Sequence, residues 1–109
     1  MRRNQFRIVL VTCASIRQAR NIAKAVVRKR LAACVNILTT PVESVYTWGG
    51  KVEKAREQLL LIKTGARQLK ALEREVRKLH SYETPEFLAL SIFDGSSEYL
   101  LWLAQSLTK

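Results

Sequence analysis

The softest metal-binding side chains in this 109-residue sequence are two cysteines and a single histidine, at Cys13, Cys34 and His80. Thiolate and imidazole favour copper(I) or zinc over magnesium or calcium. The cysteines have no C-x-x-C spacing, and one chain supplies too few such ligands for a closed four-ligand zinc site. The same residues are therefore also consistent with two buried, reduced thiols and with a histidine that either caps the end of a helix, by bonding its last carbonyls, or is otherwise satisfied.

A second group of candidates combines aromatic and ionisable side chains. Tyr46 and Trp48 lie beside a Gly-Gly pair, where they can stack on a ligand or anchor a contact between subunits. Lys63 ends an apolar run and invites an ion pair with Glu83 or Glu86, which can equally be solvated loop carboxylates. The candidate ligand-binding cleft between subunits comprises Tyr46, Trp48, Lys63, Tyr82, Glu83 and Glu86.

Hydrophobic periodicity indicates the strands and helices that must position these residues. Ser15 followed by Gln18 has the form of a capping box at the start of a helix, and Gly49 and Gly50 give the strongest turn signal. Pro41 predicts a break between two strand-like runs. The predicted strands are residues 8–13, 31–38, 42–48, 52–64 and 86–93, and the predicted helices are residues 16–30, 69–79 and 97–107.

The order β-α-β-β-α-β with a terminal helix predicts one α+β domain over residues 1–109, a ferredoxin-like split βαβ sandwich. Helices cover only one face of such a sheet. Residues 9–11, 59–62 and 88–93 are nonetheless almost continuously apolar, which is typical of strands buried on both faces. Leaving several of these side chains in water would cost several kcal/mol at about 25 cal/mol per Å². We therefore expect self-association.

Six short motifs, taken in their order and spacing, resemble the CutA (divalent-cation tolerance) family. The resemblance covers roughly residues 8–107. It implies a ferredoxin-like trimer whose long hairpins pair between subunits, a role in tolerance of divalent metal ions, copper above all, and no established reaction. The motifs are VTC at 11–13, RLAACVNI at 30–37, SVYTWGGK at 44–51, LLLIKT at 59–64, HSYETPE at 80–86 and GSSEYLLWL at 95–103.

The resemblance and the ligand chemistry together predict a copper or zinc site that needs Cys34 or His80, with Cys13 as a weaker candidate. A homotrimer would supply each ligand three times, so the site is expected between subunits or completed by Glu83, Glu86 and water. No cofactor is required for the predicted function. The protein is expected to be a non-catalytic scaffold or binding protein.

The charge of the chain raises an alternative. Nineteen Lys and Arg against nine Asp and Glu give a net charge of +10, which favours anionic partners. A basic ferredoxin-like sheet is similar to RNA-recognition modules, yet the inner strand 59–62 has no aromatic residue for base stacking. We therefore expect nucleic acid to bind weakly and without sequence preference. A small phosphatase of the same fold is disfavoured because no glycine-rich anion loop has a nearby Arg.

The N-terminal segment predicts the compartment. Arg2, Arg3 and Arg7 precede an apolar run, residues 8–11, that is too short for a signal peptide or a membrane span. We expect a cytoplasmic protein without a membrane partner.

Overall fold

The computed structural model describes residues 5–109, so Arg2 and Arg3 of the basic N-terminal segment lie outside the described range. The predicted order of strands and helices is confirmed. The elements are β1 (Phe6–Cys13), α1 (Ile16–Arg28), β2 (Cys34–Trp48), β3 (Lys51–Gly65), the short 3-10 helix η1 (Ala66–Gln68), α2 (Leu69–Leu79), β4 (Leu88–Ser91) and α3 (Ser97–Gln105).

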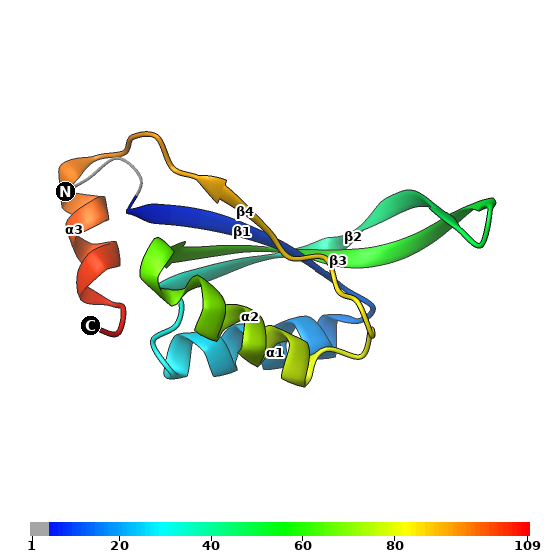
Figure 1. The fold of residues 1–109 in the computed structure, drawn as a ribbon, viewed down its shortest axis with the longest axis horizontal. Helices are drawn as coiled ribbons and strands as arrows, with labels where there is room; N and C mark the ends of the chain where they lie inside the picture. The colour runs from blue at the N-terminus through cyan, green and yellow to red at the C-terminus, as the bar shows by residue number, and fades with distance from the viewer. Residues whose placement is uncertain (1–4) are drawn as a thin grey trace.

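The four strands form one antiparallel sheet in the order β2-β3-β1-β4. Helices α1 and α2 both lie on one face of this sheet (Figure 1), as two right-handed crossovers require. The Ser15 side chain caps α1 by accepting a hydrogen bond from the Gln18 backbone N–H at 3.2 Å. Gly49 and Gly50 join β2 to β3 with φ angles of +59° and +78°, a turn that side chains other than glycine rarely tolerate. This arrangement is the predicted ferredoxin-like sandwich.

The main core lies between the sheet and the two helices. Alternate residues of the central strands point toward the helices, and none of them is exposed to solvent. They pack on the apolar side of α1 and on one side of α2. The most buried members of this core are Val9, Val11, Leu60, Ile62, Ile22, Val26, Leu72 and Val76.

The opposite face of the sheet, which we call the open face, is apolar but largely uncovered. Helix α3 covers only one end of it, where Leu103 and Leu107 pack with Phe6. At the other edge of the sheet, Leu88 and Leu90 of β4 remain 55% and 52% exposed. The predicted second apolar face is therefore present in a single chain. The open face consists of Ile8, Leu10, Leu38, Leu59, Leu61, Leu88 and Leu90.

The β2–β3 hairpin extends well beyond the rest of the sheet (Figure 1). Strand β1 ends where Cys13 pairs with Gln58, so residues 42–57 pair only with one another. We call this segment the hairpin arm. Its exposed apolar side chains include Val45, Trp48 and Val52, which are 65%, 74% and 78% exposed. The arm therefore has no hydrophobic core of its own.

Several predicted boundaries were wrong, and the strand predicted from residue 31 begins at Cys34. Pro41 does not end a strand, because β2 runs through it with a shift in pairing register between Leu38 and Val42. Strand β2 lies at the edge of the sheet, where a residue without an N–H can be accommodated. The last strand spans Leu88–Ser91 rather than residues 86–93.

No helix within residues 5–109 is long and apolar enough to cross a membrane.

Candidate functional site

His80 ends α2 and fixes the following loop to the sheet. Its Nδ1 accepts a hydrogen bond from the Tyr82 backbone N–H at 3.0 Å, so Nε2 carries the proton and donates to the Thr12 carbonyl at 2.7 Å. Both ring nitrogens are therefore occupied by hydrogen bonds within the chain. The acceptor lies on β1 rather than at the end of α2, so of the two expected roles, helix cap or satisfied histidine, the contacts of His80 fit the second. At 9% exposure, His80 is a buried, satisfied histidine.

Tyr82 connects this loop to a buried carboxylate. Its hydroxyl donates to Glu57 Oε2 at 2.8 Å, and its ring lies 4.7 Å from the ring of His80. Burial, followed by the hydrogen bond to Glu57, raises the pKa of Tyr82 to about 12. Burial and the charge of Glu57 also raise the pKa of Glu86. Glu57, Tyr82, His80 and Glu86 thus form one polar cluster where the hairpin arm leaves the sheet.

Cys13 lies beside this cluster in the core. Its side chain is fully buried, and burial together with the charge of Glu57 raises its pKa to about 11. The group is therefore a neutral thiol at physiological pH. Because metals bind the thiolate, coordination by Cys13 would require the loss of a strongly held proton.

Cys34 has different surroundings on the open-face side of β2. Its Sγ is 3.9 Å from Lys63 Nζ, and the Lys63 ammonium also donates to Asn36 Oδ1. Tyr99 of α3 is the third neighbour: burial and its contact with Cys34 raise the pKa of Tyr99. The Cys34 side chain remains partly exposed. This thiol is therefore accessible and lies next to a cation.

Within residues 5–109, the expected ion pair of Lys63 with Glu83 or Glu86 is not formed, because Lys63 contacts the neighbouring strand instead. A pair between subunits stays a prediction. The carboxylate that influences Glu86 is Glu57. Glu57 and Lys63 are six residues apart on β3, which corresponds to about 20 Å along a strand. The lysine and the acidic loop lie at different ends of the sheet.

The sheet register also separates the predicted metal ligands. Cys34 pairs with Lys63, whereas Cys13 pairs with Gln58, five positions earlier on β3. This offset is about 17 Å along the strand, and His80 is bonded at the Cys13 end. Within residues 5–109, no three His, Cys, Asp or Glu residues come together to hold a metal ion. A site that uses Cys34 and His80 together would need more than one chain.

The other predicted cleft residues lie in two places, on the hairpin arm and in the loop after α2. Tyr46 and Trp48 lie on the hairpin arm at 44% and 74% exposure, and Glu83 is exposed in the loop. Tyr82 and Glu86 belong to the Glu57 cluster, and Tyr46 lies near enough to contribute to the raised pKa of Tyr82. Sequence reasoning missed Glu57, the centre of this cluster. Its position at the start of the apolar run of β3, where one strand face must be buried, was the available signal.

Replacing Tyr82 with phenylalanine is expected to lower the free energy of unfolding by about 1–3 kcal/mol, because the buried Glu57 carboxylate would lose its donor. Urea denaturation measures the change as a lower midpoint with an unchanged slope. Tyr46→Phe is the matched control, since Tyr46 is 44% exposed on the arm; its effect should stay within about 0.5 kcal/mol. Equal effects of the two substitutions would contradict a stabilising role for the bond to Glu57.

The fold and these clusters define a class: a ferredoxin-like α+β protein with an uncovered apolar sheet face and a projecting hairpin. Residues 7–106 match the family model described as CutA1 divalent ion tolerance protein. The chain belongs to this family, as the sequence motifs predicted.

Individual relatives agree with this assignment. The divalent-cation tolerance protein CutA of Thermus thermophilus is 46% identical over 99 residues, which are 91% of this chain and 95% of that protein. A solved structure of the Thermus thermophilus protein superimposes with a TM-score of 0.92 at 45% identity, covering 94% of this chain and 99% of that chain. The chloroplastic CutA protein of Arabidopsis thaliana is 43% identical over 91% of this chain, which spans only 54% of that relative.

Proposed function

We propose that this chain is a non-catalytic homotrimer that contributes to divalent-ion tolerance by binding copper or zinc, with Cys34 as the principal ligand. The partly exposed thiol of Cys34 beside Lys63 is the observation that carries the proposal. The family description names ion tolerance and no reaction, which supports a binding role.

One chain supplies too few ligands for a copper or zinc site at Cys34, and self-association would supply the others. The open face places a row of apolar side chains in water, and burying each Leu or Ile there would contribute about 1.5–3 kcal/mol. A trimer that covers this face would supply the Cys34 thiol three times. Because the open face and Cys34 lie on the same side of the sheet, covering the face would bring groups from other chains near this thiol.

The three predicted metal ligands differ in availability. Cys13 is buried with a raised pKa, and the ring nitrogens of His80 are both hydrogen-bonded. Cys34 alone among the three is partly exposed. His80 would coordinate a metal only if it gave up one of its two hydrogen bonds, and it therefore ranks second. Soft thiolate chemistry favours copper(I) and zinc.

The cytoplasm remains our proposal for the compartment. The Arabidopsis relative is named chloroplastic, and that protein is about twice as long as the region this chain covers. Membership of the family therefore does not by itself assign a compartment.

Calorimetric titration with zinc, and with copper(I) under reducing conditions, tests the metal proposal. Cys34→Ser is expected to weaken binding at least about tenfold, whereas the matched Cys13→Ser variant should bind like the parent. Lowering the pH should weaken binding by the parent, because protons compete with metal for thiolate. Undiminished binding by a trimeric Cys34→Ser variant would refute the assignment. Loss of binding in His80→Ala alone would move the site to the histidine.

A further inference from the structure

The positive charge of this protein is concentrated in its helix layer, which we define as residues 16–30 and 66–79. These two segments contain eleven Lys or Arg and two Glu, and so account for nine of the ten net positive charges. All eleven basic side chains are exposed. The layer lies on the opposite side of the sheet from the open face (Figure 1), so covering the open face would leave it in solvent.

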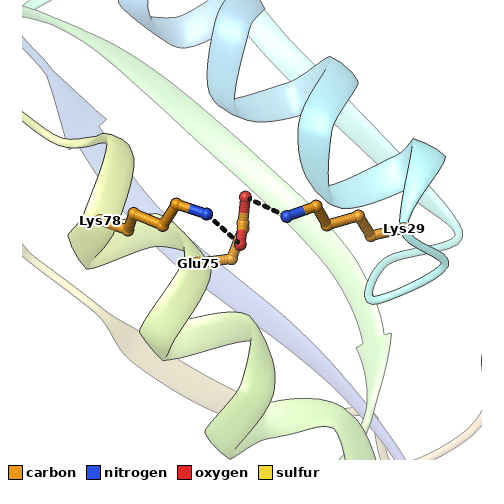
Figure 2. A network of polar contacts seen from close by, with 3 residues as sticks. All are labelled: Lys29, Glu75 and Lys78. Carbon is orange, nitrogen blue, oxygen red and sulfur yellow. Dashed lines mark hydrogen bonds and ion pairs between the residues drawn. The ribbon is translucent and has the colours of Figure 1, made fainter.

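Both acidic side chains of the layer are already neutralised. Glu75 is held between Lys29, at 3.0 Å, and Lys78, at 3.9 Å, so that one carboxylate joins the two helices (Figure 2). Glu73 pairs with Arg77 at 3.7 Å. Within residues 5–109 the remaining helix cations have no carboxylate partner. These cations are Arg17, Arg20, Lys24, Arg28, Arg30, Arg67, Lys70 and Arg74.

The spacing of the α1 cations suits an extended anion. Arg17, Arg20, Lys24 and Arg28 recur at intervals of three or four residues on one side of the helix. With a rise of about 1.5 Å per residue, this row is about 16 Å long. Lys24 and Arg28 also line a shallow hollow of about 360 Å³ between α1 and β2.

The types of side chain on the helix layer indicate which kind of polyanion it binds. Single-stranded nucleic acid is held by aromatic side chains that stack on the bases, and the helix layer has no Phe, Tyr or Trp. Binding to a membrane surface uses exposed apolar side chains as anchors. In the helix layer, Val27 is the only large apolar side chain that is exposed. Binding to the phosphates of a duplex requires neither aromatic side chains nor apolar anchors. Arginine, which forms paired hydrogen bonds with phosphate, supplies most of the unpaired cations.

We propose that the helix layer binds the sugar-phosphate backbone of double-stranded nucleic acid without reading its sequence. Lys and Arg would displace counterions condensed on the duplex, which makes the binding strongly salt-dependent. This surface is independent of Cys34 and of the open face. The activity is therefore separate from metal binding, and either proposal can fail alone.

Fluorescence anisotropy of a labelled random-sequence duplex, about 20 base pairs long, tests the proposal. The parent should bind at about 50 mM salt and lose nearly all binding by about 200 mM. The Arg17→Gln, Arg20→Gln, Lys24→Gln triple variant should bind at least about tenfold more weakly. Its plot of log binding constant against log salt concentration should be shallower, by about 0.9 in slope for each phosphate contact that is lost. Duplex DNA and duplex RNA should behave alike.

The hairpin arm provides a control with the same change in charge. Lys51→Gln, Lys54→Gln, Arg56→Gln also removes three exposed cations, but from outside the helix layer, and should bind like the parent. An equal loss in both variants would overturn the assignment to the helix layer, because net charge alone would explain it. Tighter binding to vesicles rich in anionic lipid than to the duplex, or binding that survives 200 mM salt with sequence preference, would also overturn it.

Discussion

Replacing Leu88 and Leu90 together with arginine is expected to convert a particle of about three times 12.5 kDa into a single 12.5 kDa chain. Both side chains are about half exposed on β4, so a single chain can accept the substitutions without losing its main core. In a complex that covers the open face, the same positions would bury unpaired charges, which costs several kcal/mol per site. Light scattering at micromolar concentration measures the mass.

Val27→Arg is the control for this experiment. Val27 is 40% exposed, but it lies on α1, on the covered side of the sheet. This variant should keep the mass of the parent. A double variant of Leu88 and Leu90 that remains trimeric would place the subunit contact elsewhere and leave the apolar open face unexplained.

The Cys13 thiol is expected to react with iodoacetamide at least about 100-fold more slowly in the native protein than in the unfolded chain at pH 8. Its pKa rises from 9.0 to about 11 on folding, so the thiolate fraction at this pH falls by about two orders of magnitude. Complete burial slows access further. The Cys34→Ser variant isolates this thiol, and mass spectrometry of samples with and without guanidinium compares the two rates.

The raised pKa of Cys13 also affects the stability of the protein at alkaline pH. Above pH 9.0 the Cys13 thiol ionises in the unfolded chain but not in the folded one, so the free energy of unfolding decreases as the pH rises toward about 11. The native alkylation rate should rise over the same interval. Rapid, pH-independent labelling of native Cys13 would show that the thiol is not protected by the fold.

Most of the fold was predictable because apolar periodicity and turn residues both depend on local sequence. The Ser15 cap and the Gly49–Gly50 turn lie where their residue types require. The second apolar face was predictable as well, since continuous apolar strands need two partners. Pro41 was misread because its effect depends on whether β2 is an edge or an inner strand, and that is decided by pairing with a distant part of the chain.

The candidate site was less predictable than the fold. The types of Cys34 and His80 indicate soft-metal chemistry, but only the strand register shows that they lie at different ends of the sheet. Glu57 was missed for a related reason. Its hydrogen-bond donor is Tyr82, which is 25 residues away in sequence and reaches it from the loop after α2.

If the protein is the proposed homotrimer, the hairpin arm makes its stability depend on its concentration. Two strands that pair only with each other are marginally stable in water. Residues 42–57 pair only with one another, and the contact with Tyr82 lies at the base of the arm, at Glu57. In the proposed homotrimer, contact with a neighbouring chain would add to the order of the arm. Any free energy gained in that contact belongs to the assembled species, so dilution shifts the equilibrium toward chains with a frayed, protease-sensitive arm. A melting temperature for this protein thus has meaning only at a stated protein concentration.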